Sequence, residues 1–262
     1  MAGVIKSKTA TTLIMTMRHL TRSGIQAEYL NIDSSDIVYA RNVFADVVLS
    51  SDGLDGLLFV DSDMLFRPAL ITRMIELNQD VVGAAYPKRT LDFDQFSRAL
   101  TQGSGFTPEM KNKALSSTYE FTVLPDWHTV RPGRMQVVKG FTKMAAAGMG
   151  CTLISRAALK AMVDAQVVNP RKDILSGVER TRWGFFDPVR VGDVTLSEDY
   201  SFCYRWTKQM ERDLWVCVDE TMTHLGDFAH EARYLDRLSR AAADQQTATA
   251  PGADTGPAPG AR

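Results

Sequence analysis

The sequence predicts an α/β fold in which a mixed, mostly parallel sheet is flanked by helices. Two observations lead to this prediction. Apolar residues recur with helical spacing in several segments, and short apolar segments bounded by turn residues alternate with them. The composition agrees, because 45% of the 262 residues are hydrophobic and 23% are charged. One domain over residues 1–243 is expected, followed by a disordered tail over 244–262 that is rich in Ala, Gly, Pro, Thr and Gln.

The amino-terminal half of the chain alternates predicted helices with predicted strands. Helical spacing of apolar residues, a stop at Gly24 and Pro68 near a first helical position predict the helices, whereas short apolar runs predict the strands. In chain order these are a helix over Thr9–Gly24, a strand over Glu28–Ile32, a helix over Ile37–Leu49, a strand over Gly56–Val60, a helix over Pro68–Asn78 and a strand over Asp80–Ala85. Such alternation favours parallel pairing of the strands.

The second half of the chain is less regular. The polar segment Leu91–Ser117 contains Gly103, Gly105 and Pro108 and is predicted to be an insertion or a mobile loop. Beyond it the pattern predicts strands over Tyr119–Leu124, Met135–Val138, Gly148–Ile154 and Leu214–Val218, and helices over Arg156–Ala165, Glu198–Met210 and Phe228–Ala243, with an irregular stretch before Asp187. Ser197 or Thr195 is the expected cap of the helix that begins at Glu198.

Charge and cysteine content argue against several functional classes. Thirty basic and thirty-one acidic residues give a formal net charge of -1, so no overall field attracts nucleic acid or an anionic membrane. Three cysteines are too few for a disulfide framework, and no Cys-x-x-Cys pair indicates structural zinc. No apolar run of about 18 residues predicts a membrane span, and no secretory signal is visible. We therefore expect a cytoplasmic protein, for which peripheral membrane contact stays open.

The sharpest feature is an apolar strand that ends in two aspartates, in the segment Leu57-Leu58-Phe59-Val60-Asp61-Ser62-Asp63. Residues two apart in an extended chain point to the same side, so Asp61 and Asp63 can converge while Ser62 faces away. Two carboxylates beyond the carboxyl end of a strand suit Mg²⁺ or Mn²⁺. The alternative interpretation is that both residues merely begin a turn.

Three further positions support a site, each with a structural alternative. Arg41 lies on the helix that precedes the aspartate strand, where it can bridge a sugar or phosphate oxygen and an aspartate, or face solvent. Glu198 and Asp199 open a helix whose dipole alone favours acids, and there Asp199 by preference can accept a proton from a hydroxyl group. His224 follows the last predicted strand and is either a metal ligand or a structural histidine.

Read in order, these segments resemble the GT-A fold glycosyltransferases, particularly the family-two-like group of bacterial and phage enzymes. The resemblance covers roughly Thr9 to Gly226. It rests on Phe59-Val60-Asp61-Ser62-Asp63-Met64, the strand segment Asp80–Pro87, the glycine-bearing segment Gly148–Arg156, Ser197-Glu198-Asp199 and His224-Leu225-Gly226.

The resemblance implies a Rossmann-like sheet, a Mn²⁺ or Mg²⁺ ion and a nucleotide-diphospho-sugar donor carrying UDP or GDP. It implies metal ligation by Asp61, Asp63 and His224, and a base at Asp199 or Glu198 in an inverting transfer. Donor contacts are implied for Arg41, Asp33, Asp61, Ser62 and Tyr86. A glycan, a lipid-linked group or a protein is the expected acceptor, with no nucleic acid partner.

The chain departs from this group at its start. Members usually begin with a strand and a Pro- or Gly-containing loop that hold the nucleobase, whereas this chain enters its first helix almost at once. The first strand is therefore expected to be missing or truncated, which would expose a neighbouring strand. A start assigned too late, a second chain over the gap and a degenerate domain are the open explanations.

The expected function is metal-dependent transfer of a sugar from a nucleotide diphosphate. Two alternatives remain. A nucleotidyltransferase acting on a sugar phosphate would normally carry a Gly-rich, basic phosphate loop near its start, and the sequence has none. A non-catalytic domain that binds a partner or a glycan is the other.

Overall fold

The computed structural model describes residues 4–91, 94, 96, 115–116, 118–127, 135–175, 178–227 and 229–238. Most of the predicted insertion Leu91–Ser117 and the whole predicted tail 244–262 lie outside the described residues. No helix within the described ranges has both the length and the apolar character that crossing a bilayer requires.

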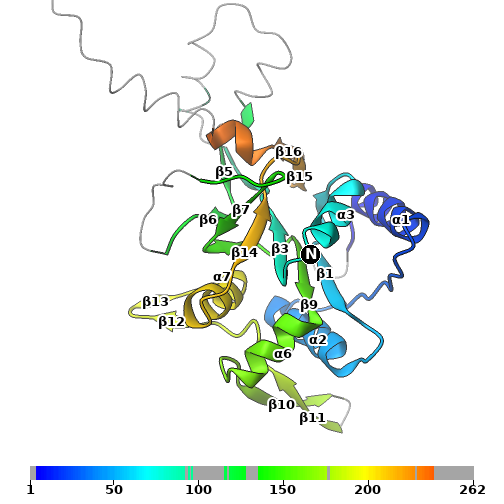
Figure 1. Cartoon of the computed structure of the whole chain (residues 1–262), viewed down its shortest axis with the longest axis vertical. Helices are drawn as coiled ribbons and strands as arrows, with labels where there is room; N and C mark the ends of the chain where they lie inside the picture. The colour runs from blue at the N-terminus through cyan, green and yellow to red at the C-terminus, as the bar shows by residue number, and fades with distance from the viewer. Residues whose placement is uncertain are drawn as a thin grey trace, which may run out of the picture.

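A five-stranded mixed sheet forms the centre of the molecule (Figure 1). Its order is β1 (Gly56–Val60), β9 (Cys151–Ser155), β3 (Val81–Ala84), β14 (Leu214–Cys217) and β7 (Phe141–Met144). β3 and β14 pair in parallel, whereas β9 lies antiparallel between β1 and β3, and β7 lies antiparallel to β14. The predicted mixed sheet is therefore confirmed, whereas its mostly parallel pairing is wrong, because one of its four strand pairs is parallel.

The direction of each strand follows from what precedes it. β1, β3 and β14 each follow a helix and run in one direction, as crossover connections require. β7 and β9 come from a part of the chain that is built of short strands in its described residues, and they run the opposite way. Because β1, β3 and β14 share a direction, the residues that follow them, including Asp61 and Tyr86, meet at one edge of the sheet.

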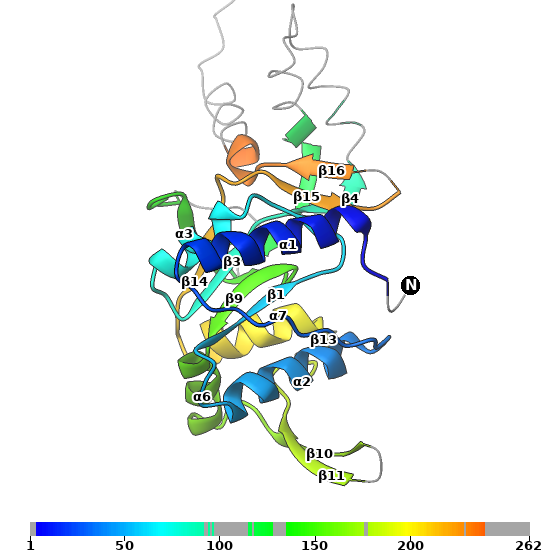
Figure 2. The same ribbon diagram turned by 90° about the vertical axis from the view of Figure 1, so that its right-hand side faces the viewer.

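Helices cover both faces of this sheet, which confirms the α/β class (Figure 2). α1 (Ser7–Arg22) and α3 (Ala69–Glu76) lie on one face, and α2 (Ile37–Ser50), α6 (Arg156–Asp164) and α7 (Glu198–Cys203) lie on the other. Side chains of a strand alternate between the two cores. Leu57 and Phe59 pack with the α2 and α6 side, and Leu58 and Val60 pack with the α1 and α3 side.

Five of the predicted helices are confirmed with small shifts of their ends: α1, α2, α3, α6 and α7. The last of these continues as a π-helix, η1 (Tyr204–Gln209), so the two together fill the predicted range Glu198–Met210. Ser197 is its cap, and its side chain accepts a hydrogen bond from the Tyr200 N–H at 3.4 Å. Thr195 instead ends a short strand, β13 (Val194–Thr195), which pairs with β12 (Arg190–Val191).

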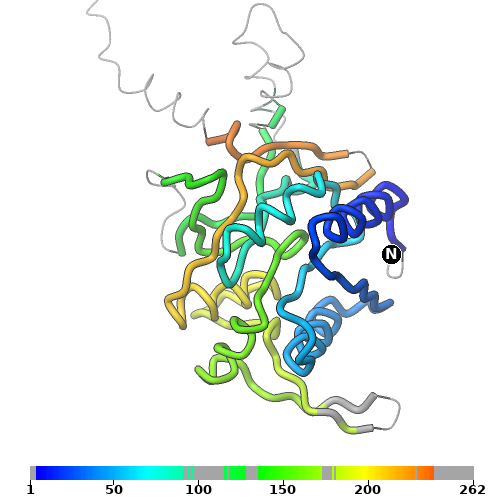
Figure 3. The backbone as a smooth tube through the Cα atoms, turned by 45° about the vertical axis from the view of Figure 1, so that its right-hand side comes forward, coloured from blue at the N-terminus to red at the C-terminus, as the bar shows by residue number. Residues whose placement is uncertain are grey.

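The predicted strand Glu28–Ile32 is wrong. Residues 25–34 form an irregular connection from α1 to α2 (Figure 3), and residues 4–6 lead into α1 without a strand. Tyr29 and Leu30 are 57% and 45% exposed, so the segment finds no sheet against which to bury its apolar side chains. β1 consequently remains an edge strand of the central sheet.

Three other predictions need correction. The stretch before Asp187 contains a hairpin of β10 (Pro170–Leu175) and β11 (Val178–Trp183) in place of irregular chain. Met135–Val138 forms no strand beyond a single bridge between Val138 and Phe141, and β7 begins after it. The predicted helix Phe228–Ala243 is replaced at its start by β16 (Ala229–Ala232), where burial alternates, and residues 234–238 are helical.

Short accessory sheets extend the edge of the central sheet where β1 and β3 end. β15 (Met222–Leu225) lies between β16 and β2 (Met64–Leu65). β4 (Pro87–Leu91) pairs with β5 (Tyr119–Phe121), and β6 (Val123–Leu124) pairs with β8 (Ala146–Ala147). The first of these sheets brings the late segment around His224 to the aspartates that follow β1.

Candidate functional site

Arg41 is the centre of the first group of site residues. Only 4% of it is exposed, and its guanidinium contacts three carboxylates. Arg41 Nη2 lies 3.4 Å from Asp61 Oδ1, Arg41 Nη1 lies 3.4 Å from Glu198 Oε1, and Asp199 is in direct contact with Nη1. The chain thus joins the predicted donor-binding arginine, one predicted metal ligand and both predicted base candidates in one charged network.

Helix α2 presents Arg41 in a fixed position. The Asp36 side chain caps this helix by accepting a hydrogen bond from the Tyr39 N–H at 3.0 Å. Asn42 then anchors the helix to the segment before α7. Its amide donates to Asp187 at 2.9 Å and its carbonyl oxygen accepts from the Phe186 N–H at 2.9 Å. The guanidinium of Arg41 lies 5.8 Å from the ring centre of Phe59, which holds it against the apolar end of β1.

Asp63 belongs to a second group, with His224 and Arg89. His224 Nε2 lies 3.6 Å from Asp63 Oδ2. Arg89, on β4, contacts the same carboxylate oxygen with its guanidinium. The side chains of Asp63 and His224 are 15% and 16% exposed, so this group is largely screened from solvent yet not sealed.

Backbone pairing explains how His224 comes to lie beside Asp63. In the sheet formed by β16, β15 and β2, His224 lies opposite Met64, the residue after Asp63. The Leu225 N–H also donates a hydrogen bond to the Asp63 carbonyl at 2.8 Å. The register of this sheet therefore fixes the pair, and neither long-range contact is visible from local sequence alone.

The hydrogen bond of the other ring nitrogen determines the tautomer of His224. Nδ1 lies 3.0 Å from the carbonyl oxygen of Pro87, which can only accept, so Nδ1 carries the hydrogen and donates it. Burial lowers the pKa of His224, and the charge of Arg89 lowers it further, while the Pro87 bond and Asp61 oppose these effects. Neutral His224 thus directs the lone pair of Nε2 at Asp63.

Tyr86 lies behind this group instead of lining it. Its ring packs edge-to-face against His224 with 5.5 Å between ring centres, and its hydroxyl accepts a hydrogen bond from the Gly150 N–H at 3.2 Å. Burial raises the pKa of the Tyr86 hydroxyl, and the negative charge of Asp61 adds to the effect. A Cβ on Gly148 would lie 2.2 Å from this hydroxyl, so the glycine-bearing segment makes room for the tyrosine that supports His224.

Two residues predicted to bind the donor are not brought into either group. Asp33 is exposed in the connection between α1 and α2. Ser62 is exposed in the turn that follows β1, and its carbonyl oxygen accepts a hydrogen bond from the Lys6 N–H at 3.0 Å.

Sequence reasoning missed Arg89 and Lys6. Arg89 ends the run Tyr86-Pro87-Lys88-Arg89 directly after β3, so a basic pair past a strand end was the available signal. The Lys6 ammonium donates to the Gly226 carbonyl at 3.0 Å, which ties the start of α1 to the His224 segment. No local pattern marks Lys6, because its partner lies near the other end of the chain.

The donor atoms fit a divalent cation in part. In the described part of the chain no three His, Cys, Asp or Glu side chains are gathered as a metal-binding group, since Asp61 turns to Arg41. Asp63 Oδ2 and His224 Nε2 do fit, because ligand bonds of about 2.1 Å place two ligands of one ion at most about 4.2 Å apart. Both direct lone pairs at each other, and a cation between them would satisfy both.

The charges of the two groups also suit a divalent ion. Four carboxylates, those of Asp61, Asp63, Glu198 and Asp199, face two guanidinium groups, those of Arg41 and Arg89. With His224 neutral, two formal negative charges remain uncompensated among these side chains. Both of these charges belong to the Arg41 group, since Asp63 and Arg89 balance each other, so a cation held by Asp63 is attracted by the neighbouring Arg41 group.

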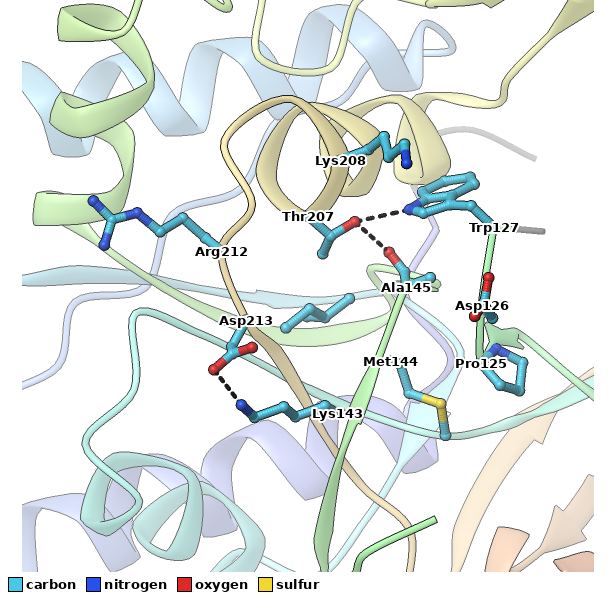
Figure 4. Close-up of a pocket in the computed structure, with 11 residues that line it drawn as sticks. Pro125, Asp126, Trp127, Lys143, Met144, Ala145, Thr207, Lys208, Arg212 and Asp213 are labelled. Atoms are coloured by element: carbon cyan, nitrogen blue, oxygen red, sulfur yellow. Dashed lines mark hydrogen bonds and ion pairs between the residues drawn. The ribbon is translucent and has the colours of Figure 1, made fainter. Parts of the chain in front are cut away.

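A pocket of about 320 Å³ lies away from these residues, between β7, β14 and η1 (Figure 4). None of the predicted site residues lines it. The Trp127 indole N–H donates to the Thr207 hydroxyl at 2.9 Å, and Lys143 pairs with Asp213 at 2.6 Å. Thr207 lies in η1, the continuation of the helix that begins at Glu198, and follows Asp199 by eight residues, which is about 12 Å along the helix.

Comparison with known proteins gives a distant structural likeness. No family model matches the chain, and no curated protein matches it. Among solved structures it is similar to the one described as the crystal structure of A197 from STIV, at 14% sequence identity and a TM-score of 0.45, covering 87% of this chain and 83% of that one. We draw no functional conclusion from a similarity of this level.

Proposed function

We propose that the chain is a divalent-metal-dependent glycosyltransferase of the GT-A type that transfers a sugar from a nucleotide diphosphate to an acceptor. The observation that supports this most is the facing pair of Asp63 and His224, whose tautomer is fixed for ligation, beside a network with two uncompensated negative charges. The site lies beyond the carboxyl ends of β1 and β3, where α/β sheets bind ligands.

In this proposal Asp63 and His224 hold Mn²⁺ or Mg²⁺, and Asp61 is shared between the ion and Arg41. A divalent ion at this position supplies neutralisation of the diphosphate as it leaves. Tyr86 and the Pro87 carbonyl keep the His224 ring in place from behind. Arg41, buried and held by Asp61, Glu198 and Asp199, positions these carboxylates relative to one another.

Glu198 and Asp199 are the two candidates for the base that takes the acceptor proton. Both side chains are about one-fifth exposed, and both lie in the first turn of α7 beside Arg41. Both carboxylates contact Arg41 Nη1, so each shares its acceptor capacity between the guanidinium and a substrate.

A panel of UDP- and GDP-sugars incubated with Mn²⁺ tests the proposal through release of nucleoside diphosphate, with or without an added acceptor. Wild type should release it only with the divalent ion present, and Asp63→Asn should lose this activity while keeping its unfolding midpoint. The matched control is Asp52→Asn, on an aspartate that is 99% exposed and precedes β1, whereas Asp61 and Asp63 follow it. Turnover of Asp63→Asn equal to that of Asp52→Asn would remove the metal role from the proposal.

The base is assigned by two isosteric variants. Asp199→Asn and Glu198→Gln each remove one carboxylate charge and keep the side-chain size. We expect the variant that lacks the base to have a kcat for transfer about 10² to 10⁴ times lower than that of wild type. The affinity of this variant for the donor should equal that of wild type, whereas a substitution that disrupted the structure of the site would change the affinity as well.

A non-catalytic domain that binds a partner or a glycan is the second candidate, favoured by one observation. The segment Glu28–Ile32 forms no strand, so β1 is left as an edge and the contacts expected there for a nucleobase are not formed. No release of nucleoside diphosphate from any sugar donor in the panel, with or without Mn²⁺, together with binding of a glycan, would favour this candidate.

A further inference from the structure

Arg89 lies where a cation is expected. Its guanidinium contacts Asp63 Oδ2, the same oxygen that faces His224 Nε2 at 3.6 Å. A divalent ion bound between Asp63 and His224 would bring a second positive group onto this oxygen. Because like charges at ion-pair distance repel, the guanidinium and the ion compete for Asp63.

The strand that carries Arg89 is loosely paired around this residue. On β4 and β5, Pro87 lies opposite Phe121 and Leu91 lies opposite Tyr119, so the ladder is irregular between these two pairs. More residues separate the two pairs on β4 than on β5, and such bulges redirect side chains near functional sites. The Arg89 side chain is 49% exposed, so it has solvent-filled space to turn into.

Gly226 leaves space on the other side of Arg89. A Cβ at this glycine would lie 3.3 Å from Arg89 Cδ and 3.3 Å from His230 Nε2, closer than most side chains approach. Gly226 therefore lets the aliphatic part of the Arg89 side chain lie across the segment that follows His224. A larger residue would push the guanidinium away from Asp63.

The two arginines of the site differ in how firmly they are held. Arg41 is 4% exposed, contacts three carboxylates and lies over aromatic rings. Arg89 lies on a bulged strand, β4, where its side chain is half exposed and contacts the carboxylate of Asp63. Of the two, Arg89 is the one that a competing ion displaces more easily, because an ion pair with a half-exposed partner contributes little stability.

We propose that Arg89 is an exchangeable cation of this site, which neutralises Asp63 until a divalent ion binds there and then turns to the phosphates of the donor. The inference rests on the proposed function and adds a phosphate-binding residue to it. A released guanidinium suits that task, since its planar fork of donors binds phosphate oxygens in pairs. No bond is made or broken in the exchange, and one ion pair replaces another.

Binding of Mn²⁺ alone, followed by the electron paramagnetic resonance signal of the free ion, tests the first half. Arg89→Ala should bind Mn²⁺ about fivefold more tightly than wild type, which is what the loss of an exposed ion pair allows. Lys88→Ala is the matched control, because Lys88 precedes Arg89, carries the same charge, is 47% exposed and pairs with Glu120 at 3.2 Å. It should leave the Mn²⁺ affinity unchanged.

Binding of UDP and of GDP to the Mn²⁺-loaded protein tests the second half. Here Arg89→Ala should bind the nucleoside diphosphate at least about tenfold more weakly than wild type, as expected for a hydrogen bond to a charged group. Arg89→Gln, which keeps the length of the side chain without its charge, should shift both affinities in the same directions. This variant keeps the test available if the alanine variant folds poorly.

The results separate this inference from the proposed function. Mn²⁺ affinity of Arg89→Ala and Arg89→Gln that is equal to or weaker than wild type overturns the exchange, whatever the catalytic activity. So does tighter Mn²⁺ binding that Lys88→Ala reproduces. Opposite shifts for Mn²⁺ and for nucleoside diphosphate support the exchange, and they do so even where no sugar donor is turned over.

Discussion

Replacing Arg41 by alanine should destabilise the fold strongly. Arg41 is 4% exposed and is shared by Asp61, Glu198 and Asp199. Its removal leaves these carboxylates close together without the positive charge that offsets their mutual repulsion. Breaking a buried ion pair by removing one partner costs about 3–5 kcal/mol. Asp61 is 35% exposed and the other two about one-fifth, so water relieves part of the repulsion and we expect the lower end, about 3 kcal/mol.

Urea unfolding measures this change, and the midpoint of thermal unfolding should fall by roughly 6–12 °C. Arg190→Ala is the control, because Arg190 is 72% exposed and its contact with Asp193 spans 3.8 Å. It should stay within about 0.5 kcal/mol of wild type. The double variant Arg41→Ala with Asp199→Asn should be more stable than Arg41→Ala alone, since one of the uncompensated charges is gone.

An Arg41→Ala variant as stable as Arg190→Ala would refute this reasoning. In that case the carboxylates would not depend on the guanidinium, and Arg41 would be free to serve the donor alone. If Asp199→Asn does not restore stability to Arg41→Ala, the destabilisation comes from lost packing against Phe59 and not from uncompensated charge.

Three further predictions concern packing, pH and catalysis. Gly148→Ala should cost about 1–3 kcal/mol by driving a methyl group into the Tyr86 hydroxyl and should lower Mn²⁺ affinity, whereas Gly53→Ala, whose Cβ has open space, should be neutral or slightly stabilising in thermal unfolding. Burial raises the pKa of Cys203 and Cys217 to about 12 from an ordinary 9.0, so the folded protein favours their neutral thiols. The free energy of unfolding in urea should therefore be unaffected by these thiols below pH 9.0 and should fall as pH rises toward 12, because the unfolded chain ionises first. This fall should be less steep in Cys203→Ala. Asp199→Asn and Glu198→Gln should differ by an order of magnitude or more in kcat for transfer, and equal losses would contradict a single base.

Much of the site follows from short-range patterns. Alternation predicts that Asp61 and Asp63 converge, but residues 61–63 form a turn in which the Met64 N–H donates to the Asp61 carbonyl at 3.2 Å, and the two carboxylates join different groups. The end of an apolar strand does place Asp61 directly after β1, and helix capping places Glu198 and Asp199 after Ser197. These rules depend on neighbours in sequence, so the sequence carries them. Their meeting with Arg41 follows from the packing of α2 and α7 on one face of the sheet.

Other features depend on contacts that local patterns do not encode. Glu28–Ile32 has a strand-like composition, yet the chain offers no neighbour that buries it, and Tyr29 stays exposed. The charged segment 170–183 lacks apolar alternation and still forms a hairpin, for which the dipeptide Ser176-Gly177 between the two strands was the available signal. The contact of Arg89 with Asp63 requires β3 and β1 to end at the same edge.

Pulsed electron paramagnetic resonance of bound Mn²⁺ tests the central claim, that Asp63 and His224 hold a divalent ion between them. Wild type should show coupling of the manganese to an imidazole nitrogen. His224→Ala should lose this coupling, and Asp63→Asn should bind Mn²⁺ much more weakly. Manganese that binds tightly without nitrogen coupling, or with the same coupling after His224→Ala, would contradict the account.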